Sequence, residues 1–255
     1  MRALQRHCVV SRALAARSDD HGARRAALAI ASGLVVMAAI GWHAPAAAQT
    51  PPSAAEVARY VGLHQAAQQG DVAAVERLIA SGATVDTRDD NGRTPLHVAT
   101  FARQREVVRA LAGAGADLGA FDNDRYDAVT IAAVADDEET LRVLLALGAS
   151  AKFVTSRYDG TALIAAAHLG HDGVVRQLIA AGAPLDHVNN LHWTALVEAV
   201  VLGNGGRRHV ETVRALVNAG ASTTLTDREG RTPLALARER GYVDIVTILV
   251  RAGAK

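Results

Sequence analysis

The chain has 255 residues, of which 50% are hydrophobic, 4% aromatic and 21% charged. This apolar fraction excludes an intrinsically disordered chain, and a single cysteine, Cys8, excludes a disulfide scaffold. Because 54 of the residues are alanine and 22 are glycine, the composition favours closely packed helices over a core of large aromatic side chains. The length alone fits one or two ordinary domains, or a repeat array, equally well.

The net charge of +1 is distributed unevenly along the chain. Residues 1–48 hold six arginines and two aspartates, so residues 49–255 retain 21 of the 27 basic and 24 of the 26 acidic side chains, a net charge of −3. A mildly acidic body lacks the basic face that nucleic acids require. We therefore expect no nucleic-acid partner.

Residues 1–48 have the layout of a secretory signal peptide. An arginine pair at 24–25 precedes an uncharged apolar run at 26–40, and three alanines at 46–48 provide a small-residue cleavage site. This order predicts a mature chain that starts at Gln49 and is periplasmic or secreted. The residues around the arginine pair differ from those of a twin-arginine signal, so a Sec-type signal is favoured.

The alternative is an uncleaved anchor in the inner membrane. Residues 26–48 are just long enough to span a bilayer, although His43 and Pro45 weaken the end of the segment. Cleavage would remove Cys8 and leave a mature chain without a thiol. Such a chain suits an oxidising compartment and has no cysteine nucleophile or thiolate metal ligand.

From residue 53 onward the sequence repeats. A Gly-Ala pair recurs at intervals of 33, 33, 34, 38 and 33 residues, at Gly82, Gly115, Gly148, Gly182, Gly220 and Gly253. A fixed period of this length is typical of a solenoid. The chain resembles the ankyrin-repeat family, particularly its bacterial exported members, and carries the family's opening signature at 89–99 (DDNGRTPLHVA) and 227–234 (DREGRTPL).

The resemblance covers residues 53–255 and implies an all-α ankyrin solenoid of six repeats with short hairpin-like fingers. A linker and N-cap are expected at 49–55, where Ser53 and Glu56 make a capping box. The ankyrin domain is expected at 56–255, with repeats opening near residues 56, 89, 122, 156, 189 and 227.

Each marker of the repeat has a physical role. Thr94 can cap a helix through its hydroxyl, and Pro95 takes the first helical position, where a missing N–H is harmless. Gly70 is expected to separate the two helices of repeat one, and Gly82 to end the second helix in a left-handed conformation. The extended stretch and turn after each Gly-Ala pair predict a finger between helix pairs.

Repeat three departs most from the family pattern. Asp-Ala-Val-Thr at 127–130 replaces Thr-Pro-Leu-His, and four acids at 136–139 replace the Gly-His turn. Its apolar helix positions survive, so we expect a repeat of locally lower stability. The acids could attract a cation, but they open a helix, where acids interact favourably with the helix dipole, and we favour that interpretation.

The histidines do not predict a metal site. Histidine is a common zinc ligand, but the resemblance implies that His97 and His171 bond to backbone between repeats. His187 and His192 flank one finger with no carboxylate placed beside them. We expect no metal and no cofactor. We also expect no enzyme, because no catalytic constellation stands out and a solenoid seldom encloses a water-excluding pocket.

Repeat five contains an insertion, Gly203–His209, which we expect to add five residues to the turn between its two helices. Glycines followed by Arg207 and Arg208 ahead of a helix could hold an anion or phosphate. The insertion lacks the Lys-Ser/Thr pair of a P-loop, so nucleotide binding is not expected. A flexible loop and a partner contact are the other interpretations.

The resemblance implies that partners bind at the finger tips and at the concave ends of the first helices. Of the eight aromatic residues beyond residue 48, five lie in the fingers. The helix ends of the central repeats are apolar and those of the outer repeats are polar, which is typical of an interface. The alternative is that the rings support neighbouring fingers. The candidate partner-binding residues are Phe101, Tyr126, Val134, Tyr158, His168, Leu169, Trp193 and Leu202.

These observations predict an exported, non-catalytic adaptor that binds a folded protein through its concave face. The membrane would be a partner only if residues 1–48 stay attached, and we expect a monomer. The partner itself is not identified by any residue of the sequence.

Overall fold

The computed structural model describes residues 49–255. The signal-peptide and anchor predictions fall on residues 1–48, outside the described residues, and stay predictions. No helix of residues 49–255 is long and apolar enough to cross a bilayer.

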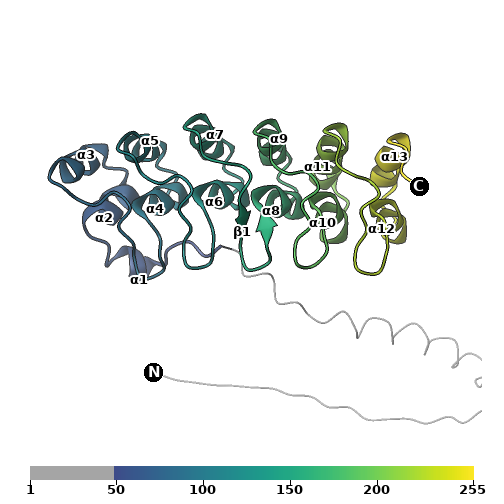
Figure 1. The fold of residues 1–255 in the computed structure, drawn as a ribbon, viewed down its shortest axis with the longest axis horizontal. Coiled ribbons are helices and arrows are strands. Elements are labelled where there is room, and N and C mark those ends of the chain that lie inside the picture. The colour runs from purple at the N-terminus through teal and green to yellow at the C-terminus, as the bar shows by residue number, and fades with distance from the viewer. Residues whose placement is uncertain (1–48) are drawn as a thin grey trace, which may run out of the picture. The chain divides into compact units, whose positions relative to one another are not determined.

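Residues 54–251 form helix pairs stacked side by side (Figure 1). The first helices of the pairs, called inner helices, are α2 (Gly62–Gln69), α4 (Pro95–Phe101), α6 (Ala128–Val134), α8 (Ala162–Leu169), α10 (Ala195–Val201) and α12 (Pro233–Glu239). The outer helices are α3 (Val72–Ala80), α5 (Arg105–Gly113), α7 (Glu138–Ala146), α9 (Asp172–Ala180), α11 (Arg207–Asn218) and α13 (Val243–Arg251). A one-turn helix, α1 (Ala54–Val57), precedes them. The six-repeat helical solenoid is confirmed.

The fingers are the turns that precede the inner helices, and Figure 1 shows them projecting beyond the inner row. The tips of fingers two to six are at residues 89–94, 122–127, 156–161, 189–194 and 227–232. In finger four, β1 (Val154–Thr155) pairs antiparallel with β2 (Gly160–Thr161), with Val154 opposite Thr161.

Side-chain caps begin several of the helices, although the hydroxyl of Thr94, for which a cap was predicted, lies 2.9 Å from Nδ1 of His97 instead. Ser53 and Glu56 form the capping box, and the hydrogen bonds from Ser53 lower the pKa of Glu56 to about 2. The hydroxyls of Thr161, Thr194 and Thr232 each accept the amide three residues on, at 3.2 Å. Such caps contribute about 1 kcal/mol each.

Repeat three keeps these caps with different residues. Asp127 accepts the amide of Thr130 at 2.8 Å, so it replaces the capping threonine in function. Asp137 caps α7 through Thr140, and Glu138 and Glu139 occupy the first turn of that helix. The acidic run therefore opens α7, at the helix end where acids interact favourably with the helix dipole.

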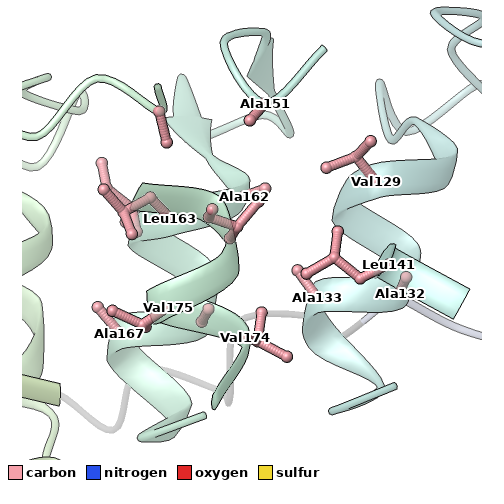
Figure 2. Close-up of a cluster of buried hydrophobic side chains, with 14 of the residues drawn as sticks. Val129, Ala132, Ala133, Leu141, Ala151, Ala162, Leu163, Ala167, Val174 and Val175 are labelled. Carbon is pink, nitrogen blue, oxygen red and sulfur yellow. The ribbon is translucent and has the colours of Figure 1, made fainter. Parts of the chain in front are cut away.

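The core consists of small and branched side chains. Figure 2 shows Val129 and Ala133 of α6 and Ala162 of α8 between the helices, with Leu141 and Val174 contributed by the outer row. Burying a leucine or valine fully contributes about 1.5–3 kcal/mol. No aromatic ring is among the largest fully buried side chains of the described residues, which are Leu96, Leu111, Ile131, Leu141, Leu144, Leu163, Leu178, Leu196, Leu216, Leu234, Leu236 and Ile245.

The finger turn needs a residue in the left-handed conformation. Gly92 of finger two and Gly230 of finger six have φ of +71° and +75°. A Cβ on Gly92 would lie 2.3 Å from Oδ1 of Asn123 and 3.0 Å from its backbone nitrogen, whereas one on Gly230 would meet nothing within 4 Å. The same conformation thus has different steric surroundings in the two fingers.

We expect Gly92→Ala to lower the free energy of unfolding more than Gly230→Ala. Both substitutions introduce left-handed strain of about 1–2 kcal/mol, but only Gly92→Ala also displaces Asn123, at a further cost of about 1–2 kcal/mol. Urea denaturation of the two variants and the parent measures the difference. Equal losses in the two variants would contradict the close packing of fingers two and three.

Candidate protein-interaction site

The ends of the inner helices carry apolar side chains in two neighbouring registers. Phe101, Val134 and His168 occupy equivalent positions and are partly buried. Leu169 and Leu202 lie one position further on and are 41% and 44% exposed. Leu169 ends α8 and Leu202 is the C-cap of α10, and these two inner helices pack directly against each other. We call this pair of leucines, in repeats four and five, the apolar platform.

Phe101 is covered by an arginine of the preceding finger. The guanidinium carbon of Arg93 lies 5.8 Å from the centroid of the Phe101 ring, and Arg93 is buried. Its Nη1 is 3.1 Å from Oε1 of Glu56, and its Nη2 donates to the carbonyl of Thr50 at 3.0 Å. Arg93 therefore fastens repeat two to residues 50–56 and does not stand free at a finger tip.

The fingers form a connected row. Backbone amides donate to carbonyls of the preceding finger at 3.0 Å in three places, Asn123 to Asn91, Ser156 to Arg125 and Asn190 to Tyr158. Fingers two to five are thus hydrogen-bonded to one another. Any partner surface that touches them meets a row of fixed spacing.

Tyr126, Tyr158 and Trp193 are all partly buried in this row. Burial raises the pKa of the Tyr126 phenol. The guanidinium of Arg157 lies 5.8 Å from the Tyr158 ring, and Trp193 packs against the core. Each ring therefore presents one part to its own repeat and leaves another part in contact with solvent.

Two other aromatic residues support neighbouring fingers. Phe121 and Phe153, which precede the tips of fingers three and four, meet edge to face with ring centroids 5.7 Å apart. The alternative interpretation of the finger aromatics thus applies to this pair.

Comparison with known proteins places this architecture in a family. The profile for ankyrin repeats (three copies) matches residues 63–155 and 129–227, and the single ankyrin-repeat profile matches residues 229–255. The chain belongs to the ankyrin-repeat family. Ankyrin repeats are protein–protein interaction modules without catalytic activity as a rule.

The ankyrin chain is similar to bacterial and eukaryotic relatives. It is 38% identical over 190 residues to the ankyrin repeat protein YahD of Escherichia coli, covering 74% of this chain and 94% of that one. An ankyrin repeat domain from Acinetobacter baumannii superposes with a TM-score of 0.72 at 44% identity, covering 76% and 98% of the two chains. The ankyrin domain of Bcl-3, a member of the IkappaB protein family, gives 0.69 at 31%, covering 77% and 88%.

The histidines of the ankyrin repeats hold backbone between repeats. Besides His97, ring nitrogens lie within 3 Å of carbonyl oxygens of neighbouring repeats in four further pairs, which are His64 with Arg93, His171 with Ala133, His187 with Asp159 and His209 with His168. The structural interpretation of His97 and His171 is confirmed. Within residues 49–255 no three His, Cys, Asp or Glu side chains are grouped so that they could hold a metal ion.

The expectation for the repeat-five insertion was wrong in one respect. Helix α11 begins at Arg207, so only residues 203–206 form the turn and the remaining added residues lengthen the helix. The lengthened helix places Arg208 2.7 Å from Oδ2 of Asp136 and 3.4 Å from Oδ1 of Asp172. These contacts bridge repeats three, four and five.

Two carboxylates therefore already engage one of the two arginines for which anion binding was one of the interpretations. Arg207 is exposed at the first position of α11. Anion binding at this turn stays a prediction, and the ion pairs of Arg208 weigh against it.

Glu198 and Asn189 of repeat five were not singled out from the sequence. Glu198 of α10 is buried, accepts a hydrogen bond from Nδ2 of Asn189 at 2.9 Å, and lies 3.4 Å from Nδ1 of His168. The signal available in the sequence was a glutamate at a helix register that is uncharged in every other repeat. His168 is thus a candidate partner-binding residue that lies beside a buried carboxylate.

We expect replacement of His97 to flatten the dependence of stability on pH in acid. The Thr94 amide donates to Nδ1 of His97 at 3.0 Å, so the Nε2–H faces the Tyr126 carbonyl at 3.1 Å and the ring is neutral. Burial lowers the pKa of His97 below its ordinary value of 6.5. As the pH falls below about 6.5, the His97 ring is therefore protonated in the unfolded chain before it is protonated in the folded chain. The free energy of unfolding decreases over this range as the pH falls.

The loss approaches about 1.4 kcal/mol per pH unit while only the unfolded chain is protonated. Urea denaturation of the parent and of His97→Gln between pH 7.5 and about pH 5 measures the two slopes. Identical slopes would show that His97 is protonated equally in the folded and unfolded chains.

Proposed function

We propose that the protein is a periplasmic adaptor that binds a folded protein partner through its concave face and fingers. The observation that carries the proposal is the platform of Leu169 and Leu202, which leaves two leucines of neighbouring inner helices more than 40% exposed. Exposed apolar surface rimmed by polar residues is typical of an interaction site.

The surroundings of the platform support this proposal. Tyr126, Tyr158 and Trp193 lie in adjacent fingers with partly exposed rings, and aromatic side chains are the commonest hot spots of interfaces. At the ends of the row the equivalent helix positions carry Gln69 and Arg240. The mechanism is surface complementarity, with the aromatic rings as anchors and the leucines as the apolar centre.

Periplasmic location rests on residues 1–48 and on the prediction of cleavage before Gln49. The second candidate is a scaffold tethered to the inner membrane by residues 26–48. The arginine pair, apolar run and small-residue site favour the cleaved form.

Sequencing the N-terminus of the exported protein separates these two forms. We expect the mature chain to begin at Gln49, because the small residues at 46–48 suit signal peptidase. Fractionation of the same cells is expected to recover the chain with periplasmic contents. A chain that retains residues 26–48 and sediments with membranes would support the tethered form instead.

We expect the double variant Tyr158→Ala, Trp193→Ala to lose its partner. Truncation of one hot-spot ring costs about 2 kcal/mol, which is about 30-fold in affinity. Crosslinking and pull-down from periplasmic extract with the tagged parent identifies the partner, and titration with the purified partner measures the loss.

The matched control is Leu147→Ala, at a residue that is 38% exposed at the end of the outer helix α7. It should bind like the parent, and circular dichroism should show that both variants stay folded. Undiminished binding by the folded double variant would contradict the proposed site.

A further inference from the structure

Two asparagine–glycine pairs occur in the chain, at 91–92 in finger two and at 204–205 in the insertion of repeat five. Such a pair can cyclise, because the backbone nitrogen of the glycine can attack Cγ of the asparagine side chain and close a five-membered imide. Glycine hinders this closure least, since it has no Cβ. Whether a pair reacts in the folded chain depends on the contacts that hold its nitrogen atoms.

The pair in finger two is held at both reacting groups. The amide of Gly92, which would be the nucleophile, donates to the carbonyl of Asp89 at 2.9 Å. The side-chain nitrogen of Asn91, which would be the leaving group, donates to Oε1 of Glu56. Gly92 is also buried, and the carbonyl of Asn91 accepts the amide of Asn123 at 3.0 Å. Ring closure at Asn91 therefore requires hydrogen bonds to be broken.

The pair in repeat five has neither restraint. Within residues 49–255, no acceptor is bonded to the amide of Gly205 or to the side-chain nitrogen of Asn204, and Asn204 is exposed. The side-chain oxygen of Asn204 accepts the amide of Gly206 at 2.9 Å and lies 3.1 Å from Nδ1 of His209. The Gly206 amide is placed to stabilise the negative charge that develops on this oxygen when the glycine nitrogen attacks.

The fold also requires a glycine directly after Asn204. Gly205 has φ of +67°, in the left-handed region that other residues adopt only with strain. A Cβ at this position would lie 2.4 Å from Cδ1 of Tyr242. The hydroxyl of Tyr242 donates to the carbonyl of Gly203 at 2.8 Å, so this ring is anchored beside the turn. The insertion thus joins an unrestrained asparagine amide to a glycine that no larger residue can replace without distorting the turn.

We propose that Asn204 is a site of spontaneous deamidation. A bond forms between the nitrogen of Gly205 and Cγ of Asn204, the bond from Cγ to Nδ2 breaks, and Nδ2 leaves as ammonia with the proton of the Gly205 amide. Water then opens the imide at either carbonyl, which gives aspartate or isoaspartate at position 204. Both products carry a carboxylate two residues along the chain from Leu202 of the apolar platform. The reaction needs no partner, so it does not rest on the proposed function.

Peptide mass spectrometry of the aged full chain measures the conversion at both pairs. Trypsin releases residues 89–93 with Asn91 and residues 177–207 with Asn204, and fragment masses locate the change within the longer peptide. After incubation in mildly basic buffer, we expect Asn204 to be converted about tenfold faster than Asn91, because only Asn91 must first give up hydrogen bonds. In urea, where the fold is lost, the two pairs should be converted at similar rates.

The matched control variant is Asn204→Ser, which removes the reactive amide and keeps an oxygen acceptor for Gly206. The mass change in residues 177–207 should disappear in this variant. An Asn204 that stays intact in the folded chain, equal rates at Asn91 and Asn204 in the folded chain, or a mass change that persists in Asn204→Ser would overturn the proposal. A tenfold difference that remains in urea would also overturn it, because the fold would then not be the cause.

Each of these results leaves the pull-down with the Tyr158 and Trp193 variant as a separate test of partner binding.

Discussion

Every helix pair of this chain leaves apolar surface uncovered until a neighbouring pair packs on it. Leu96, Leu163 and Leu196 are fully buried in the array, where their helices α4, α8 and α10 pack against the inner helices of the adjacent repeats. The stability of such an array is approximately a sum of repeat and interface contributions. This constraint explains a composition rich in alanine and poor in aromatics, since equivalent helices that pack closely need small side chains between them.

The same constraint gives the turns between repeats their importance. Within residues 49–255 six non-glycine residues adopt positive φ. Arg125, Ser156, Asp159 and His192 lie in fingers, whereas Arg103 and Asp136 lie in turns between the two helices of one repeat. Arg125 pairs with Asp159 of the next finger at 3.1 Å, and Asp136 pairs with Arg208 two repeats away. An exposed ion pair contributes about 0–1 kcal/mol, which does not exceed left-handed strain of about 1–2 kcal/mol. These residues therefore fix the spacing of the repeats more than they raise stability.

Periodicity was sufficient to predict a solenoid, because the Gly-Ala spacing is a local feature of the chain, and the resemblance to the ankyrin family supplied its helical form. The candidate site was predictable only in part. That Arg93 covers Phe101 and that Arg208 reaches Asp136 depend on contacts between residues far apart in sequence, which no local pattern encodes. The start of α11 was misplaced because glycines at 203, 205 and 206 suggested a longer turn, whereas the helix begins directly after them.

Finger five differs from fingers two and six in how the acid of its repeat is compensated. In finger two the carboxylate of Asp89 accepts the Tyr60 hydroxyl at 2.8 Å and lies 3.7 Å from Arg93, so its charge is compensated by a permanent cation. In finger six the charge of Asp227 is compensated in the same way, because Nη2 of Arg231 lies 2.7 Å from Oδ2 of Asp227. Trp193 occupies the position of those arginines and carries no charge. The buried acid of repeat five, Glu198, therefore has no arginine of its own finger beside it, and its neighbours are Asn189 at 2.9 Å and His168 of the preceding repeat at 3.4 Å.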